Sequence, residues 1–178
     1  MERSTSNKAK EVREYVISNG ARITCAAIGN ATCGLFCTGD DSKKVSIWST
    51  KGQLPIKILE GHNSEISSVI FSKDEKNVFV GTVGGSIYMW DLGLQKISLC
   101  LKEHLNICNR ITIPHSASYL LASCSKDTTA KVWDLRAGRS FNTFRGSSTT
   151  VNDVAFAPSD QWIAAGYNDG SIKVVLCL

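Results

Sequence analysis

Short runs of alternating apolar and polar residues recur along the chain, and four of them end in a similar way. The runs KKVSIW, GSIYMW, TAKVW and SIKVV end at Trp48, Trp90, Trp133 and Val175, at intervals of 42 or 43 residues. Alternation over a few residues indicates a β-strand with one buried face. A fixed period of this length indicates a repeated structural unit. We therefore expect one all-β unit to occur four times in register.

Each repeat contains further strand-like runs that are bounded by turn residues. We divide the chain into units of about 18–60, 61–102, 103–145 and 146–178, preceded by a polar tail over residues 1–11. The first three units are predicted to hold four strands each and the last unit three. The predicted strands are Arg22–Ile28, Leu35–Thr38, Val45–Trp48, Ile56–Leu59, Ile66–Phe71, Val78–Thr82, Ser86–Trp90, Lys96–Leu101, Ile107–Ile113, Tyr119–Ser123, Thr129–Trp133, Ser140–Phe144, Val151–Phe156, Trp162–Gly166 and Ser171–Val175.

This period, with four short strands per unit and a Trp-Asp ending, is typical of the blades of a β-propeller. The fourth unit lacks its outermost strand, and Val12–Ile17 is a further candidate strand, with a short helix as the competing interpretation. That stretch could close a four-bladed ring by supplying the missing strand. We favour an open, partial propeller because the sequence ends in the apolar stretch VVLCL without a polar cap. An open arc exposes two blade faces, through which copies of the chain could self-associate.

Composition is that of an ordinary globular protein, without features of a membrane or nucleic-acid-binding protein. The 178 residues are 43% hydrophobic and 20% charged, and no apolar run approaches the length that crosses a bilayer. The net charge of +4 is a mild bias without a dense basic run, so nucleic acid is not an expected partner. The seven cysteines are odd in number and scattered, which argues against a disulfide framework or a zinc site. A polar N-terminus without a secretory signal predicts a cytoplasmic protein.

The residues around two of the repeat ends carry a family pattern. Gly61-His62 opens the second unit and Trp90-Asp91 closes it, while His104 and Trp133-Asp134 frame the third unit. Over residues 12–178, this pattern resembles the WD40-repeat family. The resemblance implies a buried hydrogen-bond network in each blade, built from a His, a turn Asp, a strand Ser or Thr and the Trp.

Only the third unit matches this network in full, with His104, Ser123, Asp127 and Trp133. The other units match in part: His62, Thr82 and Trp90 with Gly84 for the Asp in the second, Trp48 with Gly20 for the His and an offset Asp41 in the first, and Asp169 with Ser147 and Val175 for the His and Trp in the fourth. The resemblance implies a structural role for these residues. A catalytic His–Asp–Ser interpretation fails because the three side chains would be buried inside a blade.

Longer runs resemble one branch of this family. The runs WDLGLQKISLCLKEHLNIC, SKDTTAKVWDLRAGRSFNTFRG, FAPSDQWIAAGYNDGSIKV and TGDDSKKVSIWS are similar to the N-terminal propeller of katanin regulatory subunits, which are non-catalytic and contain WD40 repeats. The resemblance implies a scaffold that helps to target the katanin catalytic ATPase subunit, a microtubule-severing enzyme, to microtubules and centrosomes. It also implies a location in the cytoplasm, on microtubules or at the spindle pole. Katanin regulatory subunits carry more blades and a C-terminal helical domain that binds the ATPase, and neither occurs in this sequence.

No catalytic or cofactor motif accompanies the repeats. The sequence has no GxxxxGK[ST], GxSxG or HExxH motif. The glycine-rich stretch Gly81–Gly85 lies between two predicted strands, whereas a phosphate-binding loop precedes a helix. We therefore expect a non-enzymatic protein without a metal or cofactor, which binds other proteins through loops on a rigid scaffold.

Two sets of residues are candidates for binding a partner. The first is a set of basic residues that could contact an acidic surface such as tubulin: Lys43, Lys44, Lys51, Lys73, Lys76, Arg110 and Lys126. Attractions between exposed charges weaken as salt rises. The second is Trp133-Asp134-Leu135-Arg136, which resembles the motif by which substrate receptors of cullin-4 ubiquitin ligases bind their adaptor. In this alternative function, Arg136 contacts the adaptor and Asp134 orients the nearby backbone.

Overall fold

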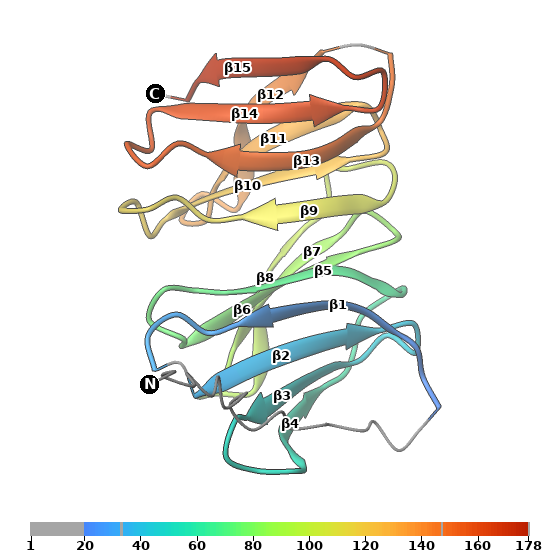
Figure 1. Ribbon diagram of the computed structural model, residues 1–178, viewed down its shortest axis with the longest axis vertical. Helices are drawn as coiled ribbons and strands as arrows, with labels where there is room; N and C mark the ends of the chain where they lie inside the picture. The colour runs from blue at the N-terminus through green and yellow to red at the C-terminus, as the bar shows by residue number, and fades with distance from the viewer. Residues whose placement is uncertain (1–19, 33, 147, 178) are drawn as a thin grey trace, which may run out of the picture.

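The computed structural model describes residues 20–32, 34–146 and 148–177, and this part of the chain forms four antiparallel sheets. Each sheet is a meander, in which every strand pairs with the next strand along the chain (Figure 1). We number the sheets one to four from the N-terminus; the first three have four strands and the fourth has three. The described residues include no helix that is long and apolar enough to cross a membrane. The strands are β1 (Ile23–Ile28), β2 (Leu35–Asp40), β3 (Val45–Ser49), β4 (Pro55–Leu59), β5 (Ile66–Phe71), β6 (Asn77–Thr82), β7 (Ile87–Asp91), β8 (Lys96–Leu101), β9 (Cys108–Thr112), β10 (Leu120–Ser125), β11 (Thr129–Asp134), β12 (Arg139–Arg145), β13 (Val151–Phe156), β14 (Trp162–Tyr167) and β15 (Ile172–Leu176).

The strands predicted from alternation are all present, and their ends lie within two residues of the expected positions. The all-β, partial-propeller prediction is therefore confirmed. The first and fourth sheets lie at opposite ends of the molecule (Figure 1). The polar tail over residues 1–11 and the candidate strand Val12–Ile17 lie outside the described residues, so ring closure by that strand stays a prediction.

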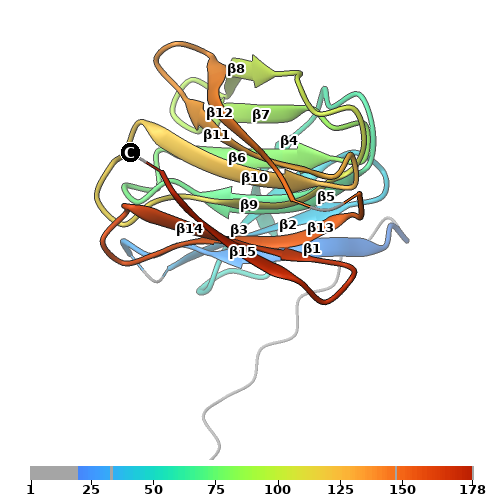
Figure 2. The ribbon, with the colours of Figure 1, turned by 90° about the horizontal axis from the view of Figure 1, so that it is seen from above.

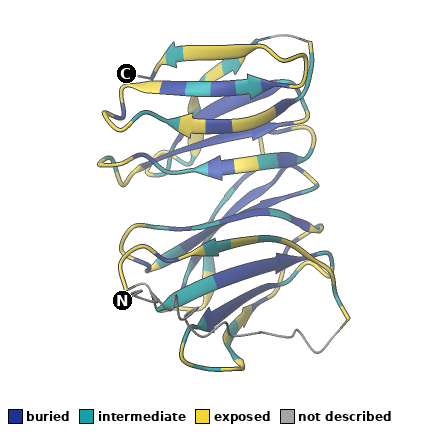
Figure 3. Cartoon of the chain, viewed as in Figure 1, coloured by how far each residue is buried: buried dark blue, intermediate teal, exposed yellow. Residues whose placement is uncertain are grey.

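The apolar core lies between neighbouring sheets. β1 contacts β5, β5 contacts β9 and β9 contacts β13, so the first strands of the four sheets form a row. Three clusters of buried apolar residues fill the three junctions, to which β5, β9 and β13 contribute Phe71, Ile111 and Val154. Figure 3 shows that exposed residues dominate β15, at one end of this stack. Removal of apolar side chains from water at the junctions therefore holds the sheets together.

Two junctions depend on a glycine in the second strand of a sheet. A Cβ atom built on Gly81 of β6 would lie 2.9 Å from both Sγ of Cys108 and Cδ1 of Ile111 in the next sheet. A Cβ atom on Gly39 of β2 would lie 2.4 Å from Cγ2 of Ile66. Carbon atoms in ordinary contact are about 3.5–4.0 Å apart. The close approach of these sheets therefore requires a residue without a side chain.

The turns lie at two opposite ends of the strands, because each sheet is an antiparallel meander. In Figure 2, which looks along the stack of sheets, the turns lie at the two sides of the molecule. One end carries the β2–β3 and β10–β11 turns and the connections between sheets; we call it the histidine face because it holds His62 and His104. The other end carries the β5–β6, β9–β10, β11–β12 and β13–β14 turns; we call it the groove face, and it holds Tyr119 and Arg136.

Candidate partner-binding groove

The third sheet contains a continuous buried hydrogen-bond network at the histidine face. Trp133 Nε1 donates to Ser123 Oγ at 2.8 Å, and the same hydroxyl lies 2.8 Å from His104 Nε2. Asp127 Oδ2 lies 2.8 Å from His104 Nδ1. The carboxylate of Asp127 can only accept, so Nδ1 of His104 donates to it, and in the tautomer protonated at Nδ1 alone Nε2 accepts from the Ser123 hydroxyl. The four residues predicted for this unit are thus joined in one chain of hydrogen bonds.

The surroundings of this network suit a structural role. Burial would raise the pKa of Asp127, but hydrogen bonds from His104, Thr129 and the main chain of Leu105 outweigh that effect and hold the pKa well below its usual range. His104 and Ser123 are 4% and 0% exposed, so a substrate has no access to them. Within the described ranges, no group of three or more His, Cys, Asp and Glu side chains is arranged to hold a metal ion.

The second sheet connects its tryptophan differently, and one predicted member takes no part. Trp90 Nε1 donates to His62 Nε2 at 2.9 Å, and His62 Nδ1 lies 2.8 Å from the main-chain oxygen of Lys43. The prediction that Thr82 belongs to this network is wrong. Its hydroxyl donates to the main-chain oxygen of Ser86 at 3.0 Å and contacts neither Trp90 nor His62.

The strand register explains this difference. The acceptor for a tryptophan stands ten residues before it: Trp133 donates to Ser123, and Trp48 of the first sheet donates to Thr38 at 3.0 Å. In the second sheet that position is Val80, whose side chain has no hydrogen-bond acceptor, so the Trp90 indole donates directly to His62. Burial lowers the pKa of His62, which favours the neutral ring that this bond requires.

The first and fourth sheets keep only part of the arrangement. Asp41 Oδ1, at the offset position, accepts a hydrogen bond from the main-chain nitrogen of Arg22 at 3.0 Å. In the fourth sheet, Asp169 Oδ1 accepts from the main-chain nitrogen and the hydroxyl of Ser171, at 2.9 and 2.6 Å. Ser147, which takes the place of the histidine there, lies outside the described residues. Asp41 thus joins the β2–β3 turn to the residue before β1, and Asp169 stabilises the β14–β15 turn.

On the groove face, a carboxylate that sequence reasoning missed connects the third and fourth sheets. Asp160, in the β13–β14 turn, is 3% exposed. It accepts hydrogen bonds from the main-chain nitrogens of His115, Ser116 and Ala117 in the β9–β10 loop, and from the Ser116 hydroxyl. Burial would raise the pKa of Asp160, but these four donors outweigh it and lower the pKa to about 2.

Glu75 makes the same connection between the first and second sheets. Its Oε1 accepts from the main-chain nitrogens of Ala31 and Thr32 at 2.8 and 3.0 Å, and its Oε2 accepts from the Thr32 hydroxyl at 2.7 Å. The hydroxyl of Thr32 is the first cause of its lowered pKa. Glu75 and Asp160 have positive φ values, 54° and 60°, and stand 85 residues apart. This shared position is the sequence signal that could have identified them.

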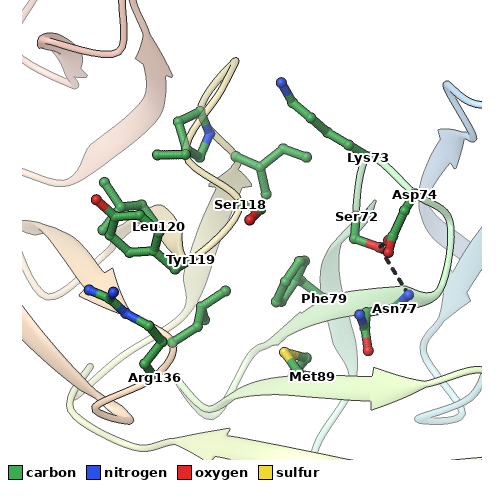
Figure 4. A pocket seen from close by; sticks show the side chains of 14 residues that line it. Ser72, Lys73, Asp74, Asn77, Phe79, Met89, Ser118, Tyr119, Leu120 and Arg136 are labelled. Carbon is green, nitrogen blue, oxygen red and sulfur yellow. Dashed lines mark hydrogen bonds between the residues drawn. The ribbon is translucent and has the colours of Figure 1, made fainter.

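The second and third sheets lack this connection, and a groove lies between them. Ser118 stands 15 residues before Trp133, as Glu75 stands 15 residues before Trp90, but it is exposed and does not have the positive φ of Glu75 and Asp160. Ser118 lines a groove of about 640 Å³ between the β5–β6 turn and the β9–β10 loop, shown in Figure 4. Apolar side chains from both sheets form much of its wall: Phe79, Met89, Ile113, Leu120 and Leu135. Polar residues, including Lys73 and Arg136, also line it.

Arg136 is held in a fixed position at this groove. Its Nη2 and Nε donate to the two carboxylate oxygens of Asp134 at 2.8 and 3.1 Å, and its main-chain nitrogen donates to Oδ1 at 2.9 Å. The guanidinium lies 3.9 Å from the centre of the Tyr119 ring. Hydrogen bonds from Arg136 lower the pKa of Asp134 to about 2. Asp134 thus orients the local backbone, as the sequence resemblance implied.

The basic residues that are candidates for contacting an acidic partner are divided between the two faces. Lys43, Lys44 and Lys126 lie in the β2–β3 and β10–β11 turns of the histidine face, whereas Lys51, Lys73 and Lys76 lie in turns of the groove face. Alternating turns of a meander cause this separation. The remaining basic candidate, Arg110, lies in β9 and pairs with Asp153 at 3.6 Å. Of the groove-face lysines, Lys73 lines the groove itself.

Comparisons with known proteins agree with this architecture. A family model described as "Nucleolar protein 10-like, N-terminal domain", a β-propeller family, matches residues 7–175. The chain is 27% identical to a guanine nucleotide-binding protein subunit beta of Zea mays over 88% of this chain and 41% of that protein. It is 25% identical to the U5 small nuclear ribonucleoprotein 40 kDa protein of Dictyostelium discoideum over 96% of this chain and 47% of that protein. The chain thus spans less than half the length of these relatives.

Proposed function

The chain belongs to the Nucleolar protein 10-like N-terminal domain family of WD40-repeat β-propellers, and from this premise we propose that it is a non-catalytic scaffold that binds other proteins at the groove. WD40-repeat proteins are generally protein-interaction scaffolds, and the relatives reported above are proteins of this kind. The observation that carries the proposal is the groove between the second and third sheets, where the inter-sheet carboxylate is missing.

The proposed occupant is an extended segment of a partner protein that carries both acidic and apolar side chains. The apolar wall, with the half-buried Met89 and Leu135 among its residues, offers a contact for apolar side chains. Lys73 is exposed and lines the same groove, so its ammonium group can attract a carboxylate. Asp74 lies there too, but its Oδ1 accepts from the Ser72 hydroxyl and the main-chain nitrogen of Lys76. At this junction, the partner's carboxylate supplies the negative charge that Glu75 and Asp160 supply at the other two junctions.

A more specific form of this proposal assigns the acidic segment to microtubules. This form of the proposal rests on the resemblance to katanin regulatory subunits and on the basic residues of the groove face. The relatives reported above carry other names. Under this proposal the chain helps to bring the katanin ATPase to microtubules or centrosomes in the cytoplasm. Because the lysines are divided between the two faces, the proposed contact uses those of the groove face alone.

Co-pelleting with microtubules at increasing salt tests this assignment. The bound fraction should fall as salt rises, because exposed charges are screened. Lys73→Glu should weaken pelleting, whereas Lys126→Glu, an exposed lysine of the histidine face, should leave it unchanged. Pelleting that is insensitive to salt, or equally sensitive to both substitutions, would exclude a charged contact at the groove.

A second candidate function is docking to the adaptor of a cullin-4 ubiquitin ligase. The observation that favours it is the fixed, exposed guanidinium of Arg136 at the end of Trp133-Asp134-Leu135-Arg136. Arg136→Ala should abolish pull-down of the adaptor while the thermal unfolding temperature stays the same. Lys73→Glu should leave adaptor pull-down intact, which separates this function from the binding of an acidic segment. If Arg136→Ala pulls down the adaptor as well as the unchanged chain does, this docking mode is ruled out.

A further inference from the structure

The three junctions between sheets repeat one apolar arrangement. The first, fourth and sixth residues of β5 are Ile66, Val69 and Phe71, and all three lie in the cluster shared with the first sheet. A β-bulge after the first residue of β5 shifts the alternation by one, so these positions share a face. The equivalent positions of the next two sheets also face the preceding sheet: Cys108, Ile111 and Ile113, and Val151, Val154 and Phe156.

A hydrogen bond also crosses each junction at the same place. The donor is the side chain of the second residue in the first strand of a sheet. The acceptor is the main-chain oxygen of the first residue in the first strand of the following sheet. The three pairs are Thr24 Oγ1 with Ile66 at 2.6 Å, Ser67 Oγ with Cys108 at 2.6 Å, and Asn109 Nδ2 with Val151 at 2.7 Å. The recurrence of this bond in three different side-chain types identifies it as part of the way in which the sheets join.

The fourth sheet presents the same arrangement on an exposed face. Ile172 and Val174 of β15 are 72% and 61% exposed, and a Cβ atom on Gly166 of β14 would meet no atom within 4 Å. Asn152, the second residue of β13, is exposed, and its amide donates to Asn168 of the same sheet at 3.3 Å. In the second sheet, the equivalent apolar residues Ile87 and Met89 pack in the cluster shared with the third sheet, and the equivalent glycine, Gly81, faces Cys108 and Ile111.

The first sheet presents the strand that such a face accepts. The first, fourth and sixth residues of β1 are Ile23, Ala26 and Ile28, again with a bulge after the first. Ile23 and Ile28 are 47% and 70% exposed, and Ala26 is exposed as well. The first and fourth sheets lie at opposite ends of the stack in Figure 1, so these two surfaces lie apart within one copy of the fold.

We propose that two copies of the chain associate head to tail, with β1 of one copy against the β13–β15 face of the other. In this contact, Asn152 Nδ2 of one copy donates to the main-chain oxygen of Ile23 in the other copy. The exposed isoleucines of β1 and the exposed Ile172 and Val174 lie within this contact, and burial of these apolar surfaces drives the association. The contact joins two different surfaces, so it either closes into a ring or continues as a filament. It does not involve the groove.

Molar mass in solution, measured by sedimentation velocity over a range of concentrations, tests the proposal. The chain should reach at least twice its monomer mass of 19.3 kDa. Val174→Lys and Ile28→Lys should each yield monomers, and Asn152→Ala should weaken the association. Leu94→Lys is the matched control, because Leu94 is 65% exposed in the β7–β8 turn, away from both surfaces, and it should associate like the unchanged chain.

A mixing experiment distinguishes head-to-tail association from other contacts. Val174→Lys keeps an intact β1, and Ile28→Lys keeps an intact β13–β15 face, so an equimolar mixture should form a dimer with one of each. Circular dichroism of each variant alone confirms that it is folded. Monomers of the unchanged chain at every concentration would overturn the proposal. Monomeric variants whose mixture stays monomeric would indicate contact between identical faces and would overturn it too.

Discussion

The third and fourth sheets are connected at the groove face, whereas the second and third sheets are not. Both junctions have an apolar cluster, and in both a side-chain hydrogen bond joins the first strands of the two sheets. At one junction Asp160 accepts four hydrogen bonds from the neighbouring loop, and at the other Ser118 stands in its place and the groove opens. The loop after the first strand therefore differs between the closed junction and the junction that forms a groove.

This difference separates two functions of similar sheets. A buried carboxylate that accepts several main-chain hydrogen bonds fixes a loop and adds stability. Where the carboxylate is absent, the loop and the turn enclose apolar surface that a partner can reach. The first and second sheets, joined by Glu75, repeat the closed form, so the molecule consists of two closed pairs with the groove between them.

The largest effect is expected from opening the closed junction with Asp160→Ala. The substitution leaves the main-chain nitrogens of His115, Ser116 and Ala117 without their acceptor, and it should lower the free energy of unfolding by about 2–4 kcal/mol. Urea denaturation followed by tryptophan fluorescence measures this change. Ser118→Ala is the matched control at the open junction and should change stability by less than about 0.5 kcal/mol. Equal losses in both variants would show that the carboxylate does not distinguish the junctions.

A smaller loss is expected when a methyl group is added inside a junction. Gly81→Ala places a Cβ atom against Cys108 and Ile111, and it should destabilise the protein by about 1–3 kcal/mol. Gly166→Ala adds the same methyl group at the exposed position of the fourth sheet, where no atom lies within 4 Å. Its effect on the unfolding free energy of the monomer should stay below about 0.5 kcal/mol. A large loss from Gly166→Ala would mean that its face is covered.

Acid should weaken the closed junction selectively. The pKa of Asp160 is lowered to about 2 in the folded protein, so the carboxylate contributes stability above its unfolded pKa of about 3.9, and the contribution disappears as the pH falls from there towards 2. Unfolding midpoints measured between pH 6 and pH 2, about the range over which this group titrates, should fall more steeply for the unchanged chain than for Asp160→Asn. Parallel profiles would contradict a folded pKa lowered by the loop.

The strands were predictable because the alternation of apolar and polar residues is a local feature of the sequence, and the repeat period shows the same feature again in each unit. The network of the third sheet was predictable for the same reason, since Ser123, Asp127 and Trp133 stand at fixed positions in one hairpin. Thr82 was assigned wrongly because its residue type fitted. The register pairs Val80 with Tyr88, as it pairs Ser123 with Lys131, so Val80 and not Thr82 occupies the acceptor position. Register sets which residues meet across a sheet, and residue type alone does not reveal it.

The groove could not be predicted in this way, because its residues come from two sheets and several turns. Lys73 and Arg136 line one groove although they belong to different repeats. Glu75 and Asp160 lie in turns, outside the alternating pattern on which the strand predictions relied. Their equivalent positions became informative only once their bonds to the preceding sheet were visible.

Ser118→Asp is the variant that tests the comparison most directly, and its main effect is expected on binding. The new carboxylate would lie in the groove and convert the open junction towards the closed form. It should repel an acidic segment and weaken the salt-dependent pelleting with microtubules about threefold or more, while the free energy of unfolding changes by less than about 1 kcal/mol. Ser118→Asn adds a side chain of nearly the same size without charge, so it separates repulsion from steric blocking. Stronger binding by Ser118→Asp would mean that the partner presents a basic segment, and the proposed charge of the occupant would be reversed.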